Sequence, residues 1–325
     1  MRHMLMARGA GRVMDVCVGL KPGESVLIIV EPDTARMGDV LAGAALDRGA
    51  EPVVAVIAPR RLQGQEPPES VRAAMLKADV VLTPLVVAID HAAAVRDAAA
   101  AGARVLAMGG ISEEQLMGGG IDADFNAIAP ICRKLADRMT QCSEARLTTE
   151  AGTDLTMDLR GRKAIALVPL LTGPGQVVGF STIEATINPV AGASHGTIVV
   201  DASILLAGFR PLGPGESFTM KIENGKVTSI EGNGEAARLR RLLDGETDAH
   251  IRDVAQLAIG LNPLARLVPE LSEAEGILGT AHIGIGSGAF LGGAFQAPMH
   301  FDVLMWNAML FLDGQIAFRD GTTVD

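Results

Sequence analysis

The chain has 325 residues, 48% of them hydrophobic and 20% charged, which is enough for two domains with sizeable cores. A net charge of −10, with no basic cluster beyond the short run at 238–241, argues against a nucleic-acid partner. Tyrosine is absent and the three cysteines are widely spaced, so a tyrosine-dependent mechanism, a disulfide framework and a zinc knuckle are all excluded.

The N-terminal residues 1–15 contain no long apolar core followed by a small-residue cleavage site, so we expect no signal peptide. No apolar run reaches the roughly 18 uncharged residues of a membrane span. Together with the cysteine usage, these features predict a cytoplasmic protein without a membrane partner.

The first 140 residues alternate strand-like and helix-like segments. The run SVLIIV at 25–30 is short, apolar and β-branched, as in a buried parallel strand. A helix is predicted at 33–50, with Asp33 as its N-cap and Gly49 at its end. Further strands are expected at 52–58, 79–86 and 104–110, and further helices at 70–78 and 91–103. This alternation predicts a parallel sheet covered by helices on both faces.

A dinucleotide site is not expected in this sheet. The turn after 25–30 reads EPDTAR, and no GxGxxG motif opens the following helix. The motif GIGSG at 284–288 lies in the wrong half of the chain, outside any strand–helix–strand context.

The pattern of predicted elements changes from about residue 143. The segment 145–164 indicates a hairpin, and Asn224-Gly225 between two alternating runs is the strongest two-residue hairpin signal. Residues 235–245 and 248–260 are helix-like. We therefore predict an α/β protein with an N-terminal parallel-sheet α/β domain, residues 1–140, and a mostly antiparallel α+β metal-binding domain, residues 141–325.

Two histidines and an aspartate stand in a glycine-rich, apolar stretch near the C-terminus. If 299–305 is a strand, His300 and Asp302 point to the same face and can present an imidazole and a carboxylate to one metal ion. With His282 they form a donor set suited to Zn²⁺ or to a non-haem Fe(II) site with open positions. The alternative is that each histidine is a core or loop residue with its own hydrogen-bond partner, and that Asp302 is a turn or cap residue.

Several longer stretches carry a family resemblance. They are HAAAVRDAAAAGARVLAM at 91–108, ARLTTEAGTDLTMDLRGR at 145–162, FSTIEATINPVAGASHGTIVVD at 180–201, NPLARL at 262–267, GTAHIGIG at 279–286, HFD at 300–302 and DGQIAFRDG at 313–321. The chain resembles the metallo-aminopeptidases of the aminopeptidase T/aminopeptidase S type. That group is related to the Fe(II)-dependent 2,5-dihydroxypyridine dioxygenases.

The resemblance implies a set of site residues. Four of them match metal ligands: Glu184, His282, His300 and Asp302. Gln256 stands where the aminopeptidases have a second metal-binding glutamate and the dioxygenases a metal-binding histidine. Ala289 stands where the aminopeptidases have a catalytic tyrosine, and His91 resembles the histidine that acts as base in the dioxygenases.

From these residues we expect a metal-dependent hydrolase, in which Zn, Co or Mn activates a water molecule against a small amide, peptide or cyclic amide. Glu184 would be a further ligand or a general base. The alternative is a mononuclear Fe(II) ring-cleaving dioxygenase of the extradiol type, acting on a hydroxylated nitrogen heterocycle with His91 as base. A third possibility is a degenerate family member that binds without turnover. As partners we expect a small-molecule substrate and further copies of the chain, in a dimer or a larger homo-oligomer.

Overall fold

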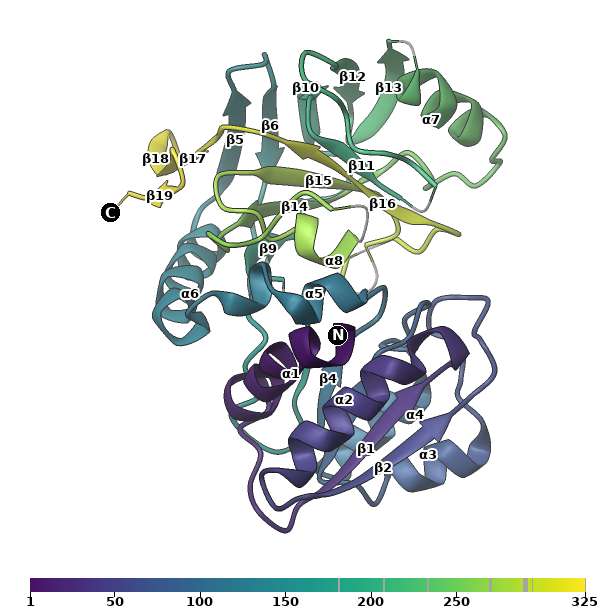
Figure 1. The fold of residues 1–325 in the computed structure, drawn as a ribbon. Coiled ribbons are helices and arrows are strands. Elements are labelled where there is room, and N and C mark those ends of the chain that lie inside the picture. The colour runs from purple at the N-terminus through teal and green to yellow at the C-terminus, as the bar shows by residue number, and fades with distance from the viewer. Residues whose placement is uncertain are drawn as a thin grey trace. The chain divides into compact units, whose positions relative to one another are not determined.

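The computed structural model describes residues 1–180, 182–206, 208–232, 234–268, 271–288, 292–293 and 295–324 (Figure 1). The chain divides into two compact units, each of which is described by itself. Unit 1 comprises Met1–Phe125, Val168–Thr182 and Leu264–Arg266, and unit 2 comprises Asn126–Leu167, Ile183–Pro263 and Leu267–Asp325. In the described part of the chain, no helix combines the length and the apolarity that crossing a membrane requires.

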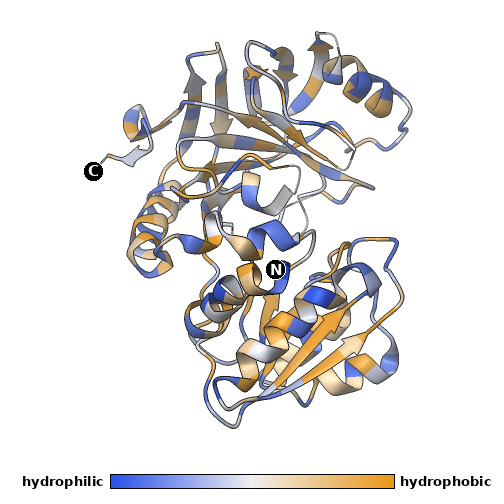
Figure 2. Ribbon diagram, in the orientation of Figure 1, coloured by the Kyte–Doolittle hydropathy of each residue, from blue (hydrophilic) through white to orange (hydrophobic). Residues whose placement is uncertain are grey.

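Unit 1 is built on a five-stranded parallel sheet with the strand order β2-β1-β3-β4-β8. The strands are β1 (Ser25–Val30), β2 (Glu51–Val56), β3 (Val80–Thr83), β4 (Arg104–Ala107) and β8 (Val177–Gly179). The inner strands are uninterrupted apolar runs because both faces of a parallel sheet are covered. The orange strands in Figure 2 show this pattern. The predicted parallel sheet is confirmed.

The helices of unit 1 are α1 (Arg2–Arg12), α2 (Ala35–Leu46), α3 (Glu69–Met75), α4 (Ala93–Ala100) and α5 (Glu113–Met117). A π-helical turn, Val13–Cys17, continues α1. Helix α2 begins two residues later than predicted, because Glu31 and Thr34 form reciprocal hydrogen bonds that close a short 3-10 turn at Pro32–Thr34.

Unit 2 contains two mostly antiparallel sheets and the helices α6 (Phe125–Gln141), α7 (Glu235–Asp244) and α8 (Leu271–Ala274). The eight-stranded sheet has the order β13-β12-β10-β6-β5-β17-β18-β19. Its strands are β5 (Glu144–Thr149), β6 (Asp154–Asp158), β10 (Ser194–Val200), β12 (Phe218–Glu223), β13 (Lys226–Glu231), β17 (Ala308–Leu312), β18 (Gln315–Arg319) and β19 (Thr322–Thr323). The predicted hairpin at Asn224-Gly225 joins β12 to β13, and both turn residues have positive φ.

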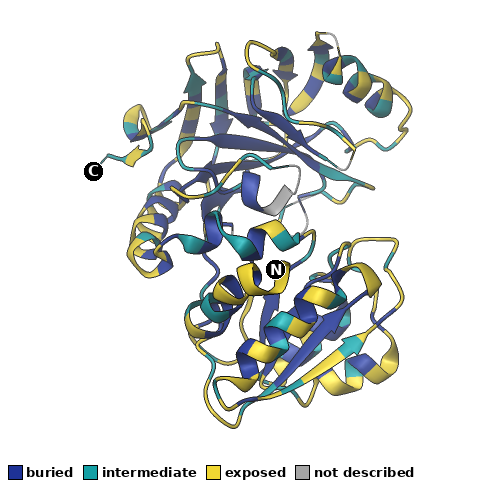
Figure 3. Cartoon of the chain, viewed as in Figure 1, coloured by how far each residue is buried: buried dark blue, intermediate teal, exposed yellow. Residues whose placement is uncertain are grey.

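The second sheet of unit 2 has six strands in the order β11-β16-β15-β14-β9-β7. They are β7 (Ile165–Leu167), β9 (Glu184–Ile187), β11 (Ser203–Leu205), β14 (Val254–Gly260), β15 (Ala281–Gly286) and β16 (His300–Met305). Every residue of β9, β14 and β15 is buried, as Figure 3 also shows. This sheet carries five of the predicted site residues.

The helix predicted at 248–260 is wrong, because Val254–Gly260 forms the central strand β14. A strand buried on both faces lacks the alternation of apolar and polar residues that identifies a half-exposed strand. Periodicity alone therefore could not separate this segment from a buried helix.

Candidate metal centre

Strand register brings the predicted ligands onto one face of the six-stranded sheet. Across β14, β15 and β16, Gly284 pairs with both Gln256 and Asp302. Two residues along these strands, His282 pairs with Ala258 and His300 pairs with Gly286. Residues that face each other on antiparallel strands point to the same side, so these side chains converge.

The convergence is visible in three distances. His300 Nε2 lies 3.2 Å from Asp302 Oδ1, and His282 Nε2 lies 3.8 Å from the same oxygen. His282 Nε2 also lies 3.7 Å from Glu184 Oε2. The side chains of Glu184 and His282 are almost fully buried, and the side chain of His300 retains 18% exposure. The structure therefore brings together all four residues that the resemblance matched to metal ligands.

Gln256 lies inside this cluster. Its Nε2 donates a hydrogen bond to Glu184 Oε1 at 3.3 Å and lies 3.2 Å from His282 Nε2. Glu184 belongs to β9, where it pairs with Gly260 of β14, and its backbone carbonyl accepts a hydrogen bond from the Cys132 thiol of α6. The structure therefore places the neutral amide of Gln256 between Glu184 and His282.

Gly284 is a site residue that the sequence reasoning missed. A Cβ atom at this position would lie 2.6 Å from His300 Cε1, 2.7 Å from Gln256 Cβ and 3.1 Å from Asp302 Oδ1. Gly284 is therefore the residue that keeps the centre of the cluster open. The sequence could have indicated it, because a residue two positions after His282 lies on the same face of a strand.

The donor set fits a metal ion. Glu184 Oε2, Gln256 Oε1 and Asp302 Oδ1 are buried oxygens that accept no hydrogen bond in the described part of the chain. Leaving a buried polar atom unsatisfied costs about 1–3 kcal/mol, which a metal ion would relieve. Ligands about 2.1 Å from an ion lie about 3.0–3.4 Å apart. The distance of 3.2 Å between His300 and Asp302 lies in this range, whereas the distances of 3.7 and 3.8 Å from His282 are longer. As the side chains stand, no three His, Cys, Asp or Glu residues within the described ranges form a group that could hold a metal ion, so the ligands would have to draw closer together around it.

Burial and mutual charge shift the pKa values of the cluster in opposite directions. Burial, with Glu275 and Asp302 nearby, raises the pKa of Glu184 well above its ordinary value. Burial lowers the pKa of His282. Burial acts against the charged forms of His300 and Asp302 as well, but their attraction outweighs it. The pKa of His300 is therefore raised and that of Asp302 lowered.

The orientation of His300 is set by a backbone contact. Its Nδ1 donates a hydrogen bond to the Ser287 carbonyl at 2.7 Å. A carbonyl only accepts, so Nδ1 carries the proton and Nε2 is left to face Asp302. This is the arrangement by which proteins fix the tautomer of a metal-binding histidine.

Two predicted residues lie outside the cluster. His91 belongs to unit 1, two residues before α4 begins at Ala93, and its carbonyl accepts a hydrogen bond from Arg96 at 2.6 Å. Its role as base stays a prediction. Ala289 lies outside the described residues.

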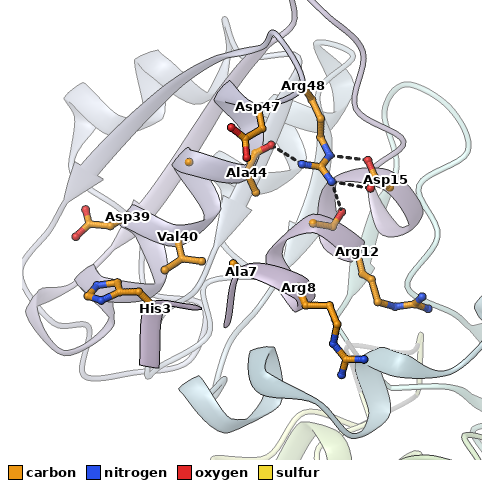
Figure 4. Close-up of a pocket in the computed structure, with 12 residues that line it drawn as sticks. His3, Ala7, Arg8, Arg12, Asp15, Asp39, Val40, Ala44, Asp47 and Arg48 are labelled. Atoms are coloured by element: carbon orange, nitrogen blue, oxygen red, sulfur yellow. Dashed lines mark hydrogen bonds and ion pairs between the residues drawn. The ribbon is translucent and has the colours of Figure 1, made fainter. Parts of the chain in front are cut away.

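A groove of about 710 Å³ between α1 and α2 of unit 1 contains none of the predicted site residues (Figure 4). Arg48, at its edge, is bound to Asp15 through two nitrogens. Small residues, including Ala7, Gly11 and Gly43, line part of the groove.

Comparison with known proteins identifies a family whose sequence model covers most of the chain. The sequence model of a family described as 2,5-dihydroxypyridine 5,6-dioxygenase matches residues 7–325. A Pseudomonas putida protein of that name is 23% identical over 195 residues, which span 57% of this chain and 55% of the relative. The alignment thus spans about half the length of this curated relative.

Two solved structures share the fold. A 2,5-dihydroxypyridine dioxygenase from Pseudomonas putida superposes with a TM-score of 0.83 at 17% identity, covering 99% of this chain and 97% of that one. AmpT from Thermus thermophilus superposes with a TM-score of 0.65 at 18% identity, covering 99% of both chains.

The expectation of a metal-dependent hydrolase is wrong. The family match over residues 7–325 supports the alternative, a dioxygenase, whereas the likeness to AmpT is one of fold. The cluster offers a physical reason. A two-metal hydrolase needs charged anchors for both ions, and the family resemblance matches the neutral amide of Gln256 to one of those positions. A divalent metal ion, with Fe(II) among the expected choices, remains consistent with the family.

Proposed function

Because this chain belongs to the 2,5-dihydroxypyridine 5,6-dioxygenase family, we propose that it is a mononuclear Fe(II) enzyme that opens the ring of a dihydroxylated nitrogen heterocycle. The observation that carries the proposal is the donor set of His282, His300 and Asp302 on one sheet face, with a carboxylate oxygen that accepts no hydrogen bond from the described residues. Two histidines and one carboxylate with open positions are typical of non-haem Fe(II) oxygenases.

Iron(II) held by such a donor set supplies the one-electron chemistry that allows dioxygen to react with an organic ring. Residues of the chain orient the ligands and leave space for the ion. His300 is held by the Ser287 carbonyl, so its Nε2 is available without a change of tautomer. Gly284 leaves the centre of the cluster free of side-chain atoms.

In this proposal Glu184 is a further ligand or a base, and Gln256 orients it. Gln256 donates to Glu184 Oε1, and this hydrogen bond orients the carboxyl group so that Oε2 faces His282. That oxygen can serve as a further ligand or hold a proton taken from a substrate hydroxyl. His91 is the second candidate for this base.

The substrate class follows from the chemistry of the family. A ring with two hydroxyl groups offers oxygen atoms that can bind a metal ion, and 2,5-dihydroxypyridine is the named substrate of the relatives. We propose 2,5-dihydroxypyridine or a close analogue, with cleavage between ring carbons 5 and 6 and both oxygen atoms of O₂ entering the product.

The proposal is tested by purification without chelator, reconstitution with Fe(II) under anaerobic conditions, and measurement of oxygen uptake. We expect about one iron per chain and consumption of one O₂ for each 2,5-dihydroxypyridine converted. Zinc-loaded protein is the matched control and should consume no O₂. Hydrolysis of an amide by the zinc form, with no oxygen uptake by the iron form, would contradict the proposal.

A further inference from the structure

The outer edge of the unit 1 sheet is an unprotected strand. Strand β2 pairs with β1 on one side and, within the described ranges, with no strand on the other. Its sequence is EPVVAV, and the side chains of Val53, Val54 and Val56 are 60%, 36% and 62% exposed. Native proteins usually protect such an edge, because its free backbone groups can pair with another chain.

The backbone of β2 presents a regular set of free groups. The N–H group of Glu51 donates to the carbonyl of Glu24, which directly precedes β1. The N–H group of Ile57 donates to the carbonyl of Val30, the last residue of β1. The backbone N–H and C=O groups of successive residues point alternately to the two sides of a strand. Val54 and Val56 therefore point these groups away from β1. Pro52 also faces outward, where its missing N–H costs no hydrogen bond in the sheet.

Both faces of this edge are apolar. Val54 lies on the side of α2, where its Cγ1 is 3.3 Å from the Cβ position of Gly38. Ile57 and Ala55 lie on the opposite side, against the core cluster that includes Val71 of α3. An added strand would therefore continue the apolar layer on both faces of the sheet.

We propose that β2 pairs with β2 of a second copy of this chain, antiparallel and about a two-fold axis at Ala55, so that two five-stranded sheets become one continuous sheet. In this register Val54 of each copy lies opposite Val56 of the other, and the pair exchanges both of its hydrogen bonds. Pro52 stays outside these pairs. The outward groups thus match their own copy, and a two-fold axis is the usual symmetry of a homodimer.

The first test disrupts the outward edge of β2. Val56→Pro deletes an outward N–H for which the described residues provide no acceptor, and Val54→Lys places a charge on the apolar edge. We expect the wild type to sediment as a dimer, or a multiple of one, at micromolar concentration. Each variant should fall to half that mass, with a dissociation constant at least about tenfold higher. Ile131→Lys, an equivalent change at a 44% exposed residue of α6, should leave assembly unchanged.

The second test fixes the register. Ala55 lies opposite Ala55 of the other copy in a non-hydrogen-bonded pair, with Cα atoms about 4.5 Å apart, which is within disulfide range. Mild oxidation of Ala55→Cys should therefore give a covalent dimer. Val53→Cys should not, since its two copies would be four residues, or about 14 Å, apart at about 3.4 Å per residue. The native cysteines are buried and leave the readout clean.

Three results would overturn the proposal. They are a wild type that stays monomeric, variants of β2 that assemble as the wild type does, and cross-linking of Val53→Cys that equals or exceeds that of Ala55→Cys. A monomer that instead captures an extended peptide along β2 would show that the edge binds another partner.

Discussion

At the scale of single residues, the candidate site depends on spacing that the sequence displays and on contacts that it hides. The i, i+2 spacing of His300 and Asp302 predicted that they share a face, and the structure places their side chains 3.2 Å apart. Glu184 came from family resemblance alone. Its contact with His282 arises because β9 and β15 flank the same central strand, which no local pattern encodes.

The first prediction concerns the ligands. His300→Ala and Asp302→Ala should each abolish tight Fe(II) binding and leave the fold intact. Mutation of a residue that merely orients a ligand typically lowers metal affinity about 10–100-fold. Loss of a ligand itself should therefore lower the affinity by more than that. His195→Ala, at an exposed histidine of β10, is the control and should bind iron as the wild type does. Wild-type iron content in either variant would place the metal elsewhere.

The second prediction concerns the open centre of the cluster. Gly284→Ala should strongly weaken iron binding, because the new methyl group would lie 2.6 Å from His300 Cε1. Gly43→Ala is the matched control, since a Cβ there meets nothing within 4 Å in helix α2. It should stabilise the protein by about 0.5–1 kcal/mol and leave iron affinity unchanged. Iron titration of both variants decides the matter, and equal affinities would contradict the role given to Gly284.

At the scale of elements, strand β14 shows where sequence reasoning failed and what the structure adds. Its residues were predicted to be helical, yet the strand lies at the centre of the sheet and bears Gln256. A bulge at Ala255 shifts the register, since Val254 pairs with Ile285 and Gln256 with Gly284. The bulge turns Gln256 towards the cluster. Asn188 donates to the Ala255 carbonyl at 2.5 Å, a contact between segments about 70 residues apart that the sequence could not reveal.

The third prediction concerns this bulge. Asn188→Ala leaves the Ala255 carbonyl without its side-chain donor, and the free energy of unfolding should fall by about 1–3 kcal/mol. If the bulge positions Gln256, iron affinity should fall as well when measured on folded protein. Denaturant unfolding and iron titration separate the two effects. Lower stability with unchanged affinity would limit Asn188 to a structural role.

At the scale of the whole molecule, the order of predicted elements gave the two kinds of sheet, but not every strand in them. Alternating strands and helices predicted the parallel sheet, and the Asn-Gly turn predicted a hairpin in a mostly antiparallel region. Strand β8 was not predicted, because it joins the parallel sheet from residues 177–179, far along the chain from β4. The choice between hydrolase and dioxygenase was wrong, since both chemistries use similar ligands on one fold.

The fourth prediction concerns peptide hydrolysis. Leucyl and alanyl p-nitroanilides should be turned over far below the ordinary rate of about 10 s⁻¹, even with zinc added. Gln256 removes a charged anchor for a second ion, and the chain has no tyrosine to stabilise an oxyanion. Gln256→Glu should raise zinc affinity or stoichiometry. Rapid hydrolysis by the wild type would contradict the assignment of Gln256.

The central claim is tested most directly by the fate of molecular oxygen. Iron-loaded protein should be mixed with 2,5-dihydroxypyridine under ¹⁸O₂, and the ring-opened product examined by mass spectrometry. Incorporation of two ¹⁸O atoms per product molecule, absent in His300→Ala, is the predicted result. A product whose new oxygen comes from water, or no conversion by fully iron-loaded protein of this or any related dihydroxypyridine, would contradict the account.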